Sequence, residues 1–419
     1  MMPVSPPTDV PTVDFPFRIS FGEAVSIVDA VAVERRLQPQ TLSLSRAHGH
    51  VLARDVIATM AQPPFDNSAM DGFALRHEDL SPEGAPTRLR LAGEQFAGPD
   101  AALVVEAGTC VRVTTGAPMP SGADTVVMKE NTSLEGDTVI VQVVPRPGQH
   151  VRRAGEDSNI GDLLLRAGDV LTPTRIGLAA SQGLAQLEVV RRPTIAVFAT
   201  GDELVEPGMS LGPGQIYNSN RDQLMALLRA EGLEPVAFPT LPDDAAQVTS
   251  ALRHAGEAFD LVLTCGGVSA GEKDLLPELL QRRGRVRMWK VMMKPGMPVL
   301  LAEGGTLGPA LFLCLPGNPV SVLATWLALG RRLVDGLQGR APRPLRRARL
   351  ASDWSKRHER LELLRGRWWI DEEGVSRVEP NPADGSHRMQ AAADSDVLIV
   401  LDAGARDYDA GTVVEVLQY

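Results

Sequence analysis

The chain has 419 residues, of which 44% are hydrophobic and 22% charged. This composition is ordinary for a globular protein and excludes a largely disordered chain, a coiled coil and a collagen-like rod. At about 100–200 residues per domain the length favours several domains. The net charge of −10 and the aromatic content of 4% disfavour binding of duplex nucleic acid and a stacking platform for single strands.

The lysines and cysteines are few. Arginine supplies most of the 42 cationic side chains, so each remaining lysine is a better candidate for function: Lys129, Lys273, Lys290, Lys294 and Lys356. The three cysteines form no CxxC motif, which argues against a disulfide framework or a zinc site and favours a reducing compartment. Residues 1–16 are rich in proline and lack the basic and apolar regions of a signal peptide. We therefore expect a flexible arm at 1–16 and a cytoplasmic location.

The first half of the chain changes character twice. Residues 21–37 repeat apolar side chains with helical spacing. Residues 56–154 instead give short β-like runs separated by Gly, Pro and Asp. Residues 155–190 are mixed again and contain a helical stretch near 173–182. We therefore predict a discontinuous linker or dimerisation domain at 17–55 and 155–190, interrupted by a β-rich inserted domain.

The second half alternates short apolar runs with helical patterns, which indicates a doubly wound sheet of parallel strands. We expect this α/β domain at 191–338, a linker at 340–344 and a C-terminal β domain at 341–419. The predicted strands are 195–199, 236–238, 261–264, 286–293, 299–302 and 311–315, and the predicted helices are 219–231, 243–258, 275–283 and 320–334. The fold class is thus multidomain α/β.

One apolar stretch is long enough to raise the question of a membrane. Residues 311–330 carry no charge, and about 20 apolar residues suffice for a membrane helix. Pro316 and Pro319 lie inside this stretch and would break a helix. We therefore predict a buried strand, a turn and a helix instead.

Four predicted strands of the α/β domain end in loops rich in glycine or carboxylates, at 201–203, 265–274, 294–298 and 316–321. Ligands of doubly wound sheets bind at the carboxyl ends of the strands. Glycine lets a backbone approach a ligand closely, and a helix N-terminus directs N–H groups at an anion. These loops therefore predict a site for a phosphorylated or otherwise anionic small molecule. The alternative is that Gly and Pro only punctuate the connections.

Carboxylates stand in or beside these loops. Glu203, Asp243 and Asp274 are suited to hold Mg²⁺ beside substrate phosphates, because Mg²⁺ prefers oxygen ligands. The alternative role is N-capping of a helix, which fits Asp243. Neither GxxxxGK[ST] nor a GxGxxG after a strand is present, which disfavours a P-loop ATPase and a dinucleotide site. Ser269 and Ser321 have no histidine in a triad-like context, so nucleophilic catalysis is disfavoured.

Two further loops, at 63–74 and 114–124, lie in the β-rich segment. Together with the loops above they resemble the molybdopterin molybdenumtransferase family, which comprises the bacterial MoeA proteins and the C-terminal E domain of gephyrin. The resemblance covers residues 16–419. It rests on DNSAMDGFA at 66–74, TGAPMPSGAD at 115–124, GED at 155–157, TGDEL at 200–204, GGVSAGEKD at 266–274, KPGMP at 294–298 and PGNPVS at 316–321.

The resemblance implies an elongated four-domain subunit that works as a homodimer, with an active site shared between the subunits. Family members insert molybdate into adenylylated molybdopterin and release AMP and molybdenum cofactor, using Mg²⁺. The substrate would be handed over from a molybdopterin adenylyltransferase and the product passed to molybdoenzymes. Neither nucleic acid nor a membrane is an expected partner.

The family's motifs also assign residues. The catalytic positions are Asp71, Thr115, Glu203, Asp274, Lys290 and Lys294. The positions that bind the pterin substrate are Gly201, Asp202, Gly266, Gly267, Ser269, Gly271, Pro295, Gly296, Pro316, Gly317, Asn318, Pro319 and Ser386. The metal positions are Glu203, Asp243, Asp274 and Asp157.

Small departures and alternatives remain. Phe73 stands where a tyrosine is common in the family, Ala270 where a larger apolar residue is common, and Leu275 replaces a frequent aromatic. The alternative functions are a molybdopterin adenylyltransferase, for which this chain has too many domains, and a non-catalytic pterin-binding scaffold. A preference for tungstate over molybdate is equally compatible with the sequence, because both are tetrahedral dianions.

Overall fold

The structure is a computed structural model that describes residues 15–81, 85–269 and 274–419. The chain forms two units, each of which is described by itself. Unit 1 comprises residues 1–53, 168–171 and 187–419, and unit 2 comprises residues 54–167 and 172–186. The predicted arm at 1–16 lies almost wholly outside the described residues. The finer division into domains stays a prediction.

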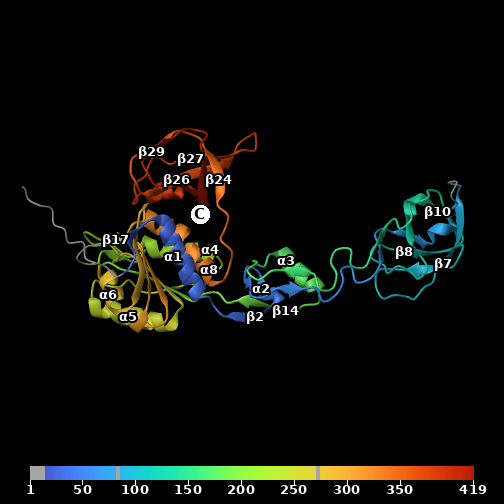
Figure 1. The fold of residues 1–419 in the computed structure, drawn as a ribbon, viewed down its shortest axis with the longest axis horizontal. Helices are drawn as coiled ribbons and strands as arrows, with labels where there is room; N and C mark the ends of the chain where they lie inside the picture. Colours follow the sequence, from blue (N-terminus) through green and yellow to red (C-terminus); the bar gives the residue numbers. More distant parts are fainter. Residues whose placement is uncertain (1–14, 82–84, 270–273) are drawn as a thin grey trace, which may run out of the picture. The chain divides into compact units, whose positions relative to one another are not determined.

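The largest sheet of unit 1 has seven strands in the order β1-β20-β22-β23-β19-β15-β18. Figure 1 shows this sheet with helices packed against it. Its strands are β1 (Phe17–Ile19), β15 (Ile195–Ala199), β18 (Val236–Ala237), β19 (Leu261–Cys265), β20 (Arg285–Val291), β22 (Leu300–Glu303) and β23 (Leu311–Leu315). The central strands are buried along their whole length, as predicted from their uninterrupted apolar runs. The bounds of β15 and β23 match the predicted ones.

The prediction of an all-parallel sheet is wrong at one strand. β22 runs antiparallel to both of its neighbours, β20 and β23. The reason is the short connection from β20 to β22, which contains no helix. A parallel crossover needs a dozen or more residues, so β22 returns beside β20 as an antiparallel partner. Because two reversals cancel, β20 remains parallel to β23.

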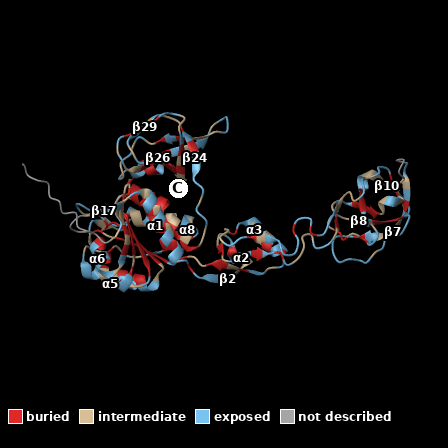
Figure 2. Cartoon of the chain, in the orientation of Figure 1, coloured by how far each residue is buried: buried red, intermediate tan, exposed pale blue. Residues whose placement is uncertain are grey.

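Helices cover both faces of this sheet. They are α1 (Phe21–Glu34), α4 (Ser219–Ala230), α5 (Ala245–Ala258), α6 (Leu275–Arg283), α7 (Pro319–Thr325) and α8 (Arg331–Leu337). Side chains alternate along each strand, so Val262 and Phe312 pack with α5 and α6, whereas Leu263 and Leu313 pack with α1, α4, α7 and α8. Figure 2 shows the result as buried strands between helices whose outer faces are exposed.

The charge-free stretch 311–330 is a buried strand followed by a turn and a helix, as predicted. Among the described residues, no helix is long and apolar enough to cross a membrane. The helix predicted at 320–334 is not continuous, because a π-helical segment at Trp326–Gly330 joins α7 to α8. Trp326 is buried against Gly330, where a Cβ would meet the indole ring at 2.5 Å.

The C-terminal part of unit 1 is a β-barrel. Its strands are β24 (Arg346–Leu350), β26 (Leu361–Ile370), β27 (Ser376–Pro380), β28 (Val397–Leu401) and β30 (Val413–Gln418). The additional pairing of β26 with β28 closes the barrel, which leaves no free edge among these strands. The strand β26 is the longest of them, with ten residues.

Short elements complete unit 1. The strand β21 (Met293–Lys294) pairs with β26, and β25 (Trp354–Lys356) pairs with β29 (Arg406–Tyr408). A three-stranded sheet has the order β2-β14-β3. The remaining bounds are β2 (Pro39–Ser43), α2 (Leu44–Ala47), β3 (Val51–Leu52), β14 (Gln186–Val190), β16 (Leu204–Val205), β17 (Ile216–Tyr217), the 3-10 turn η3 (Gly305–Leu307) and α9 (Met389–Ala393).

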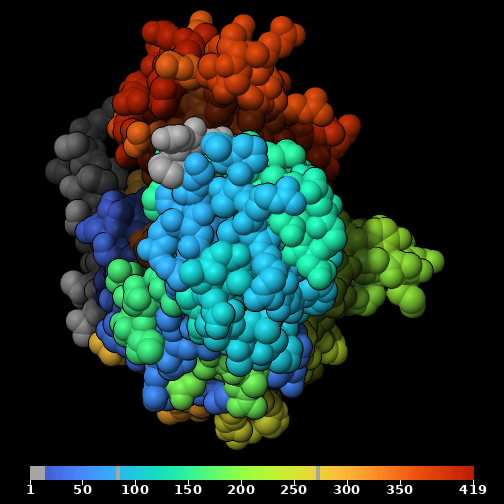
Figure 3. All heavy atoms as spheres, turned by 90° about the vertical axis from the view of Figure 1, so that its right-hand side faces the viewer, coloured from blue at the N-terminus to red at the C-terminus, as the bar shows by residue number. Residues whose placement is uncertain are grey.

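Unit 2 is built on a six-stranded sheet in the order β10-β11-β7-β8-β6-β9. Its strands bury one apolar cluster around Leu75 and Val139 and another around Ala74 and Val126. Figure 3 views the surface of this sheet region, in light blue to turquoise. The bounds are β4 (Val56–Ile57), β5 (Asn67–Ser68), β6 (Gly72–Leu75), η1 (His77–Asp79), β7 (Thr87–Gln95), β8 (Thr109–Val113), β9 (Thr125–Met128), η2 (Lys129–Asn131), β10 (Thr132–Glu135), β11 (Thr138–Val141), β12 (Val151–Arg152), β13 (Leu163–Leu165) and α3 (Pro173–Ser181).

Candidate functional site

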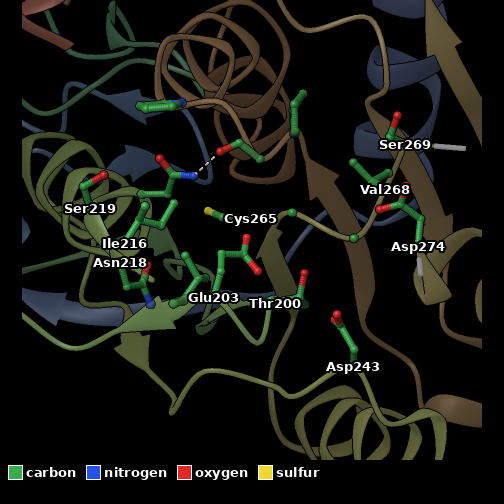
Figure 4. A pocket seen from close by; sticks show the side chains of 18 of the residues that line it. Thr200, Glu203, Ile216, Asn218, Ser219, Asp243, Cys265, Val268, Ser269 and Asp274 are labelled. Atoms are coloured by element: carbon green, nitrogen blue, oxygen red, sulfur yellow. Dashed lines mark hydrogen bonds between the residues drawn. The ribbon is translucent and has the colours of Figure 1, made fainter. Parts of the chain in front are cut away.

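A cavity of about 400 Å³ lies at the carboxyl ends of β15, β19 and β23 in unit 1 (Figure 4). This is the edge of the sheet at which the sequence predicted a ligand. Its lining contains ten of the predicted site residues: Gly201, Glu203, Asp243, Gly266, Gly267, Ser269, Asp274, Pro316, Gly317 and Pro319. Gly271 and the departure Ala270 lie outside the described residues.

The loop after β19 requires its glycines. Gly266 and Gly267 have φ angles of +97° and +65°, a region that side chains with a Cβ rarely adopt. A Cβ on Gly267 would also lie 2.8 Å from Oγ1 of Thr200. The absence of side chains therefore lets the loops after β15 and β19 pack against each other and expose their backbone to the cavity.

The loop after β23 forms another wall. Pro316, Gly317 and Pro319 line the cavity, and Asn220 at the start of α4 donates an Nδ2–H bond of 2.6 Å to the carbonyl of Gly317. This bond ties the N-terminus of α4 to the 316–319 loop. The cavity thus lies between loops that lead into helices, as an anion site requires.

Three carboxylates from separate loops line the same cavity. Figure 4 shows the side chains of Glu203, Asp243 and Asp274 directed toward the space between the loops. Asp244 rather than Asp243 caps α5, because its Oδ1 accepts a 2.8 Å bond from N–H of Gln247. The alternative capping role of Asp243 is therefore wrong. Asp202 does not line the cavity, and its Oδ1 accepts a 3.1 Å bond from N–H of Asp243.

The three carboxylates are ligands of the type that a hard cation binds. All three offer oxygen donors, which Mg²⁺ prefers, and they converge on one cavity. Within residues 15–81, 85–269 and 274–419, however, no three His, Cys, Asp or Glu side chains are grouped closely enough to hold a metal alone. Any cation here would need further oxygen ligands, such as substrate phosphates.

The two predicted lysines lie at the same edge of the sheet but outside the cavity lining. Nζ of Lys294 lies 3.0 Å from Oε1 of Glu362 and 3.0 Å from Oδ2 of Asp384. Burial opposes the charge of Lys294, but the bonds with Asp384 and Glu362 outweigh it and raise the pKa of this ammonium. Lys294 is therefore charged and forms ion pairs with the C-terminal part of unit 1.

Lys290 has a different environment. Its ammonium lies over the rings of Phe17 and Trp289, at 5.2 and 4.9 Å from their centroids. Burial, followed by the nearby charge of Arg18, lowers the pKa of Lys290. A cation on aromatic faces is stabilised but not neutralised, so it retains its attraction for an anion.

Two of the remaining predicted positions of unit 1, Asn318 and Ser386, support the 316–319 loop. Pro295, Gly296, Asn318 and Ser386 do not line the cavity. Nδ2 of Asn318 donates a 3.1 Å bond to Oγ of Ser386, and N–H of Val320 donates to the carbonyl of Ser386. These bonds connect the 316–319 loop with the segment 381–388.

Unit 2 holds a second cavity, of about 320 Å³, which Asp71 lines together with Arg112 and Lys129. Oδ1 of Asp71 accepts bonds of 2.9 Å from N–H and 3.0 Å from Oγ1–H of Thr115. These bonds, and to a lesser degree Lys129, hold the pKa of Asp71 below its usual value. Asp157 is exposed and does not line this cavity.

Several lining residues escaped the sequence reasoning. Tyr217, Asn218 and Asn220 line the larger cavity, together with Cys265. A polar N-cap stretch before a predicted helix was the available signal, and the capping bond from N–H of Arg221 to Asn218 confirms it. Burial raises the pKa of the Cys265 thiol to about 12, so this thiol is not a nucleophile at neutral pH.

Comparison with protein families matches nearly the whole chain. Residues 19–183 match the "MoeA N-terminal region (domain I and II)" and residues 196–335 match the "Probable molybdopterin binding domain". Residues 347–419 match the "MoeA C-terminal region (domain IV)". The cavity carboxylates all lie in the second matched segment.

Individual relatives and solved structures agree. The "Molybdopterin molybdenumtransferase" of Haemophilus influenzae is 38% identical over 383 residues, covering 90% of this chain and 93% of the relative. "Molybdopterin molybdenumtransferase 2" of Mycobacterium tuberculosis is 38% identical over 402 residues, covering 91% and 95%. The crystal structure of the molybdopterin biosynthesis MoeA protein from Pyrococcus horikoshii OT3 has a TM-score of 0.81 at 27% identity, covering 96% of this chain and 100% of that chain.

Proposed function

This chain belongs to the MoeA family of molybdopterin molybdenumtransferases, and from this premise we propose how its residues serve molybdenum cofactor biosynthesis. The substrates are adenylylated molybdopterin and molybdate, and the products are molybdenum cofactor and AMP. The observation that carries the assignment of the site is the cavity at the carboxyl ends of β15, β19 and β23, where glycine loops and three carboxylates converge.

The cavity binds the pterin substrate. Backbone N–H groups at the starts of α4, α6 and α7 face an anion with the positive ends of their helices. Gly266 and Gly267, which line the cavity, allow the phosphate groups to approach the backbone, because no Cβ intervenes. Asn220 holds the 316–319 loop in place through Gly317. Substrate recognition therefore rests largely on main-chain groups.

The carboxylates and the lysines have opposite tasks. Molybdate is a dianion, so Glu203, Asp243 and Asp274 would repel it, whereas Lys290 attracts it. We assign the three carboxylates to a Mg²⁺ ion that would neutralise the charge of the bridging phosphates. Lys294 positions the loop 294–298 against the barrel through Glu362 and Asp384.

AMP release tests the assignment. Purified protein is mixed with adenylylated molybdopterin, Mg²⁺ and molybdate, with oxyanion-free and tungstate reactions beside it. Molybdate-dependent release of AMP is expected from the wild type and not from Asp274→Ala. Pterin binding without oxyanion-dependent release would instead identify a scaffold and overturn the transferase mechanism. The tungstate reaction measures metal preference.

We also propose that the enzyme acts as a homodimer and that Asp71 and Thr115 of a partner subunit serve the pterin cavity. The support is the resemblance in the 66–74 and 115–124 loops and the ionised state of Asp71, which its bonds with Thr115 favour. Mixed dimers of Asp71→Ala and Asp274→Ala subunits provide the test. Neither parent variant is expected to be active alone. Activity of about a quarter of the wild-type level that appears only in the mixture supports a shared site, and its absence contradicts sharing.

A further inference from the structure

The N-terminal strand brings an additional cation to the ligand edge of the sheet. β1 pairs in parallel with β20, with Phe17 opposite Trp289 and Ile19 opposite Val291. Arg18 therefore stands at the register position of Lys290. Because β1, β20, β23, β19 and β15 run in the same direction, both residues lie toward the edge that carries the pterin cavity. The N-terminal family match begins at residue 19, just after Arg18.

The aromatic side chains connect this pair of cations with the cavity. Phe17 and Trp289 pack edge to face, with ring centroids 5.4 Å apart, and both support the ammonium of Lys290. Trp289 also donates an Nε1–H bond of 3.1 Å to the carbonyl of Val268, a residue that lines the cavity. Lys290 thus contacts an aromatic side chain that is itself bonded to the cavity wall.

The charges of this pair are not compensated inside the described part of the chain. Neither Arg18 nor Lys290 makes an ion pair there, whereas Lys294 has two carboxylate partners. The charge of Arg18 contributes to the lowered pKa of Lys290, after the larger effect of burial. Two neighbouring cations repel each other, and an anion bound between or beside them offsets this repulsion.

The backbone at both positions is unusual. Arg18 and Lys290 have φ angles of +55° and +62°, in the left-handed region that residues other than Gly, Asn and Asp rarely adopt. Such conformations cluster at functional sites, where the surrounding structure maintains them. Here the pairing of β1 with β20 maintains both.

We propose that Arg18 and Lys290 together form a subsite for a doubly charged tetrahedral oxyanion beside the pterin cavity, with Arg18 as a substrate-binding residue. This inference rests on the proposed function, which supplies two such groups, free molybdate and a phosphate of the pterin substrate. The guanidinium offers several donors in a fixed plane and suits an oxyanion better than an ammonium does.

Competitive labelling of lysines tests the subsite without turnover. The full chain is treated briefly with an amine-acylating reagent, and the modification of each of its lysines is measured by mass spectrometry. Sodium molybdate should protect Lys290 relative to sodium chloride at matched ionic strength, which is the reference. Sodium phosphate forms a second arm, so that preference for molybdate or for phosphate identifies which oxyanion the subsite takes.

The variant Arg18→Gln isolates the contribution of Arg18. We expect the molybdate or phosphate concentration that half-protects Lys290 to rise about tenfold, as for loss of one charge-assisted hydrogen bond. Arg18→Lys should recover part of the affinity. The matched control is Arg46→Gln, at an exposed arginine on α2 in unit 1, which should leave half-protection unchanged.

The outcomes separate the subsite from the enzyme assignment. Absence of Lys290 protection by both oxyanions, or an unchanged half-protecting concentration in Arg18→Gln, overturns the subsite even if wild-type AMP release is normal. Protection that weakens in Arg18→Gln supports the subsite even if no AMP is released, in which case the transferase mechanism alone fails. An unaltered circular dichroism spectrum and unfolding midpoint of Arg18→Gln check that the variant is folded.

Discussion

At the scale of single residues, hydrogen bonds decide which acidic groups stay ionised. Asp71 accepts two bonds from Thr115, and its pKa is lowered. Because the pKa of Asp71 is lowered, its carboxylate is charged at every pH above the ordinary aspartate pKa. It loses this charge only when the pH falls through the pKa of the folded state. We therefore expect Asp71 to remain ionised at pH 5, and Asp71→Asn to lower the rate of AMP release by roughly 100-fold at pH 5 and pH 7 alike. A variant that keeps wild-type turnover would contradict a catalytic role, and thermal unfolding of the variant checks the fold.

A second residue-scale prediction concerns Lys294. Its ammonium bonds Glu362, whose side chain is only 4% exposed, and Asp384, whose side chain is 50% exposed. Glu362→Gln should therefore lower the free energy of unfolding by about 1–3 kcal/mol, and Asp384→Asn, the matched control, by less than about 1 kcal/mol. Because the folded pKa of Lys294 is raised, this stabilisation is present at neutral pH and is lost only as the pH rises above the ordinary lysine value. Urea denaturation at pH 7 and above pH 10 measures both effects, and equal losses in the two variants would contradict the argument.

At the scale of elements, α1 begins at a capping box that holds it directly after β1. Oγ of Ser20 accepts a bond from N–H of Glu23, and the Glu23 carboxylate accepts a 2.8 Å bond from N–H of Ser20. We expect Ser20→Ala to cost about 1 kcal/mol of stability. The control Ser26→Ala, in the middle of the same helix, should change the unfolding midpoint little. Chemical denaturation compares the two, and identical midpoints would show that the cap does not stabilise the helix.

The loop after β19 provides another prediction at this scale. Gly267→Ala combines a positive φ with a Cβ 2.8 Å from Thr200, whereas Gly317→Ala would place its nearest contact at 3.7 Å, from Cα of Gly266. The first change should lower stability by about 1–2 kcal/mol and weaken pterin binding, while the second should leave stability nearly unchanged. Calorimetric unfolding and pterin titration measure both. Similar stability losses would mean that the loop conformation does not depend on glycine at 267.

The elements also show what a sequence can reveal. Local patterns predicted β15, β23 and α6 with the observed bounds, because uninterrupted apolar runs mark the two strands and Gly284 ends the helix. They predicted the strand β22 but not its antiparallel direction, which depends on a short connection. They also missed the π-helical segment at 326–330, which depends on the packing of Trp326 against Gly330. The glycine loops and cavity carboxylates were predictable as residue types. For Tyr217 and Asn220 the sequence offered only the polar stretch before a predicted helix. Their place in the cavity follows from the folded chain, which brings the start of α4 to the 316–319 loop.

At the scale of the whole chain, an ion-pair network fixes the linker between the sheet of unit 1 and the barrel. Nε of Arg343 donates a 2.7 Å bond to Asp335, and its Nη1 donates a 3.2 Å bond to Glu231. Both partners are largely buried. Arg343→Ala should therefore lower the free energy of unfolding by about 2 kcal/mol, and Arg340→Ala, whose contact with Asp335 is 3.4 Å, by less. Thermal unfolding of the two variants checks this order, and the reverse order would contradict it.

The pairing of β1 with β20 has a consequence for synthesis of the chain on the ribosome. The segment that carries Phe17 and Arg18 is made long before the segment that carries Trp289 and Lys290, with all of unit 2 produced in between. Until β20 emerges, the early strand has no partner, and contacts so distant along the chain form slowly. Unit 2 can fold during elongation, but the sheet of unit 1 completes its edge only after most of the polypeptide exists. Binding of the oxyanion is therefore a property that a nascent chain acquires late.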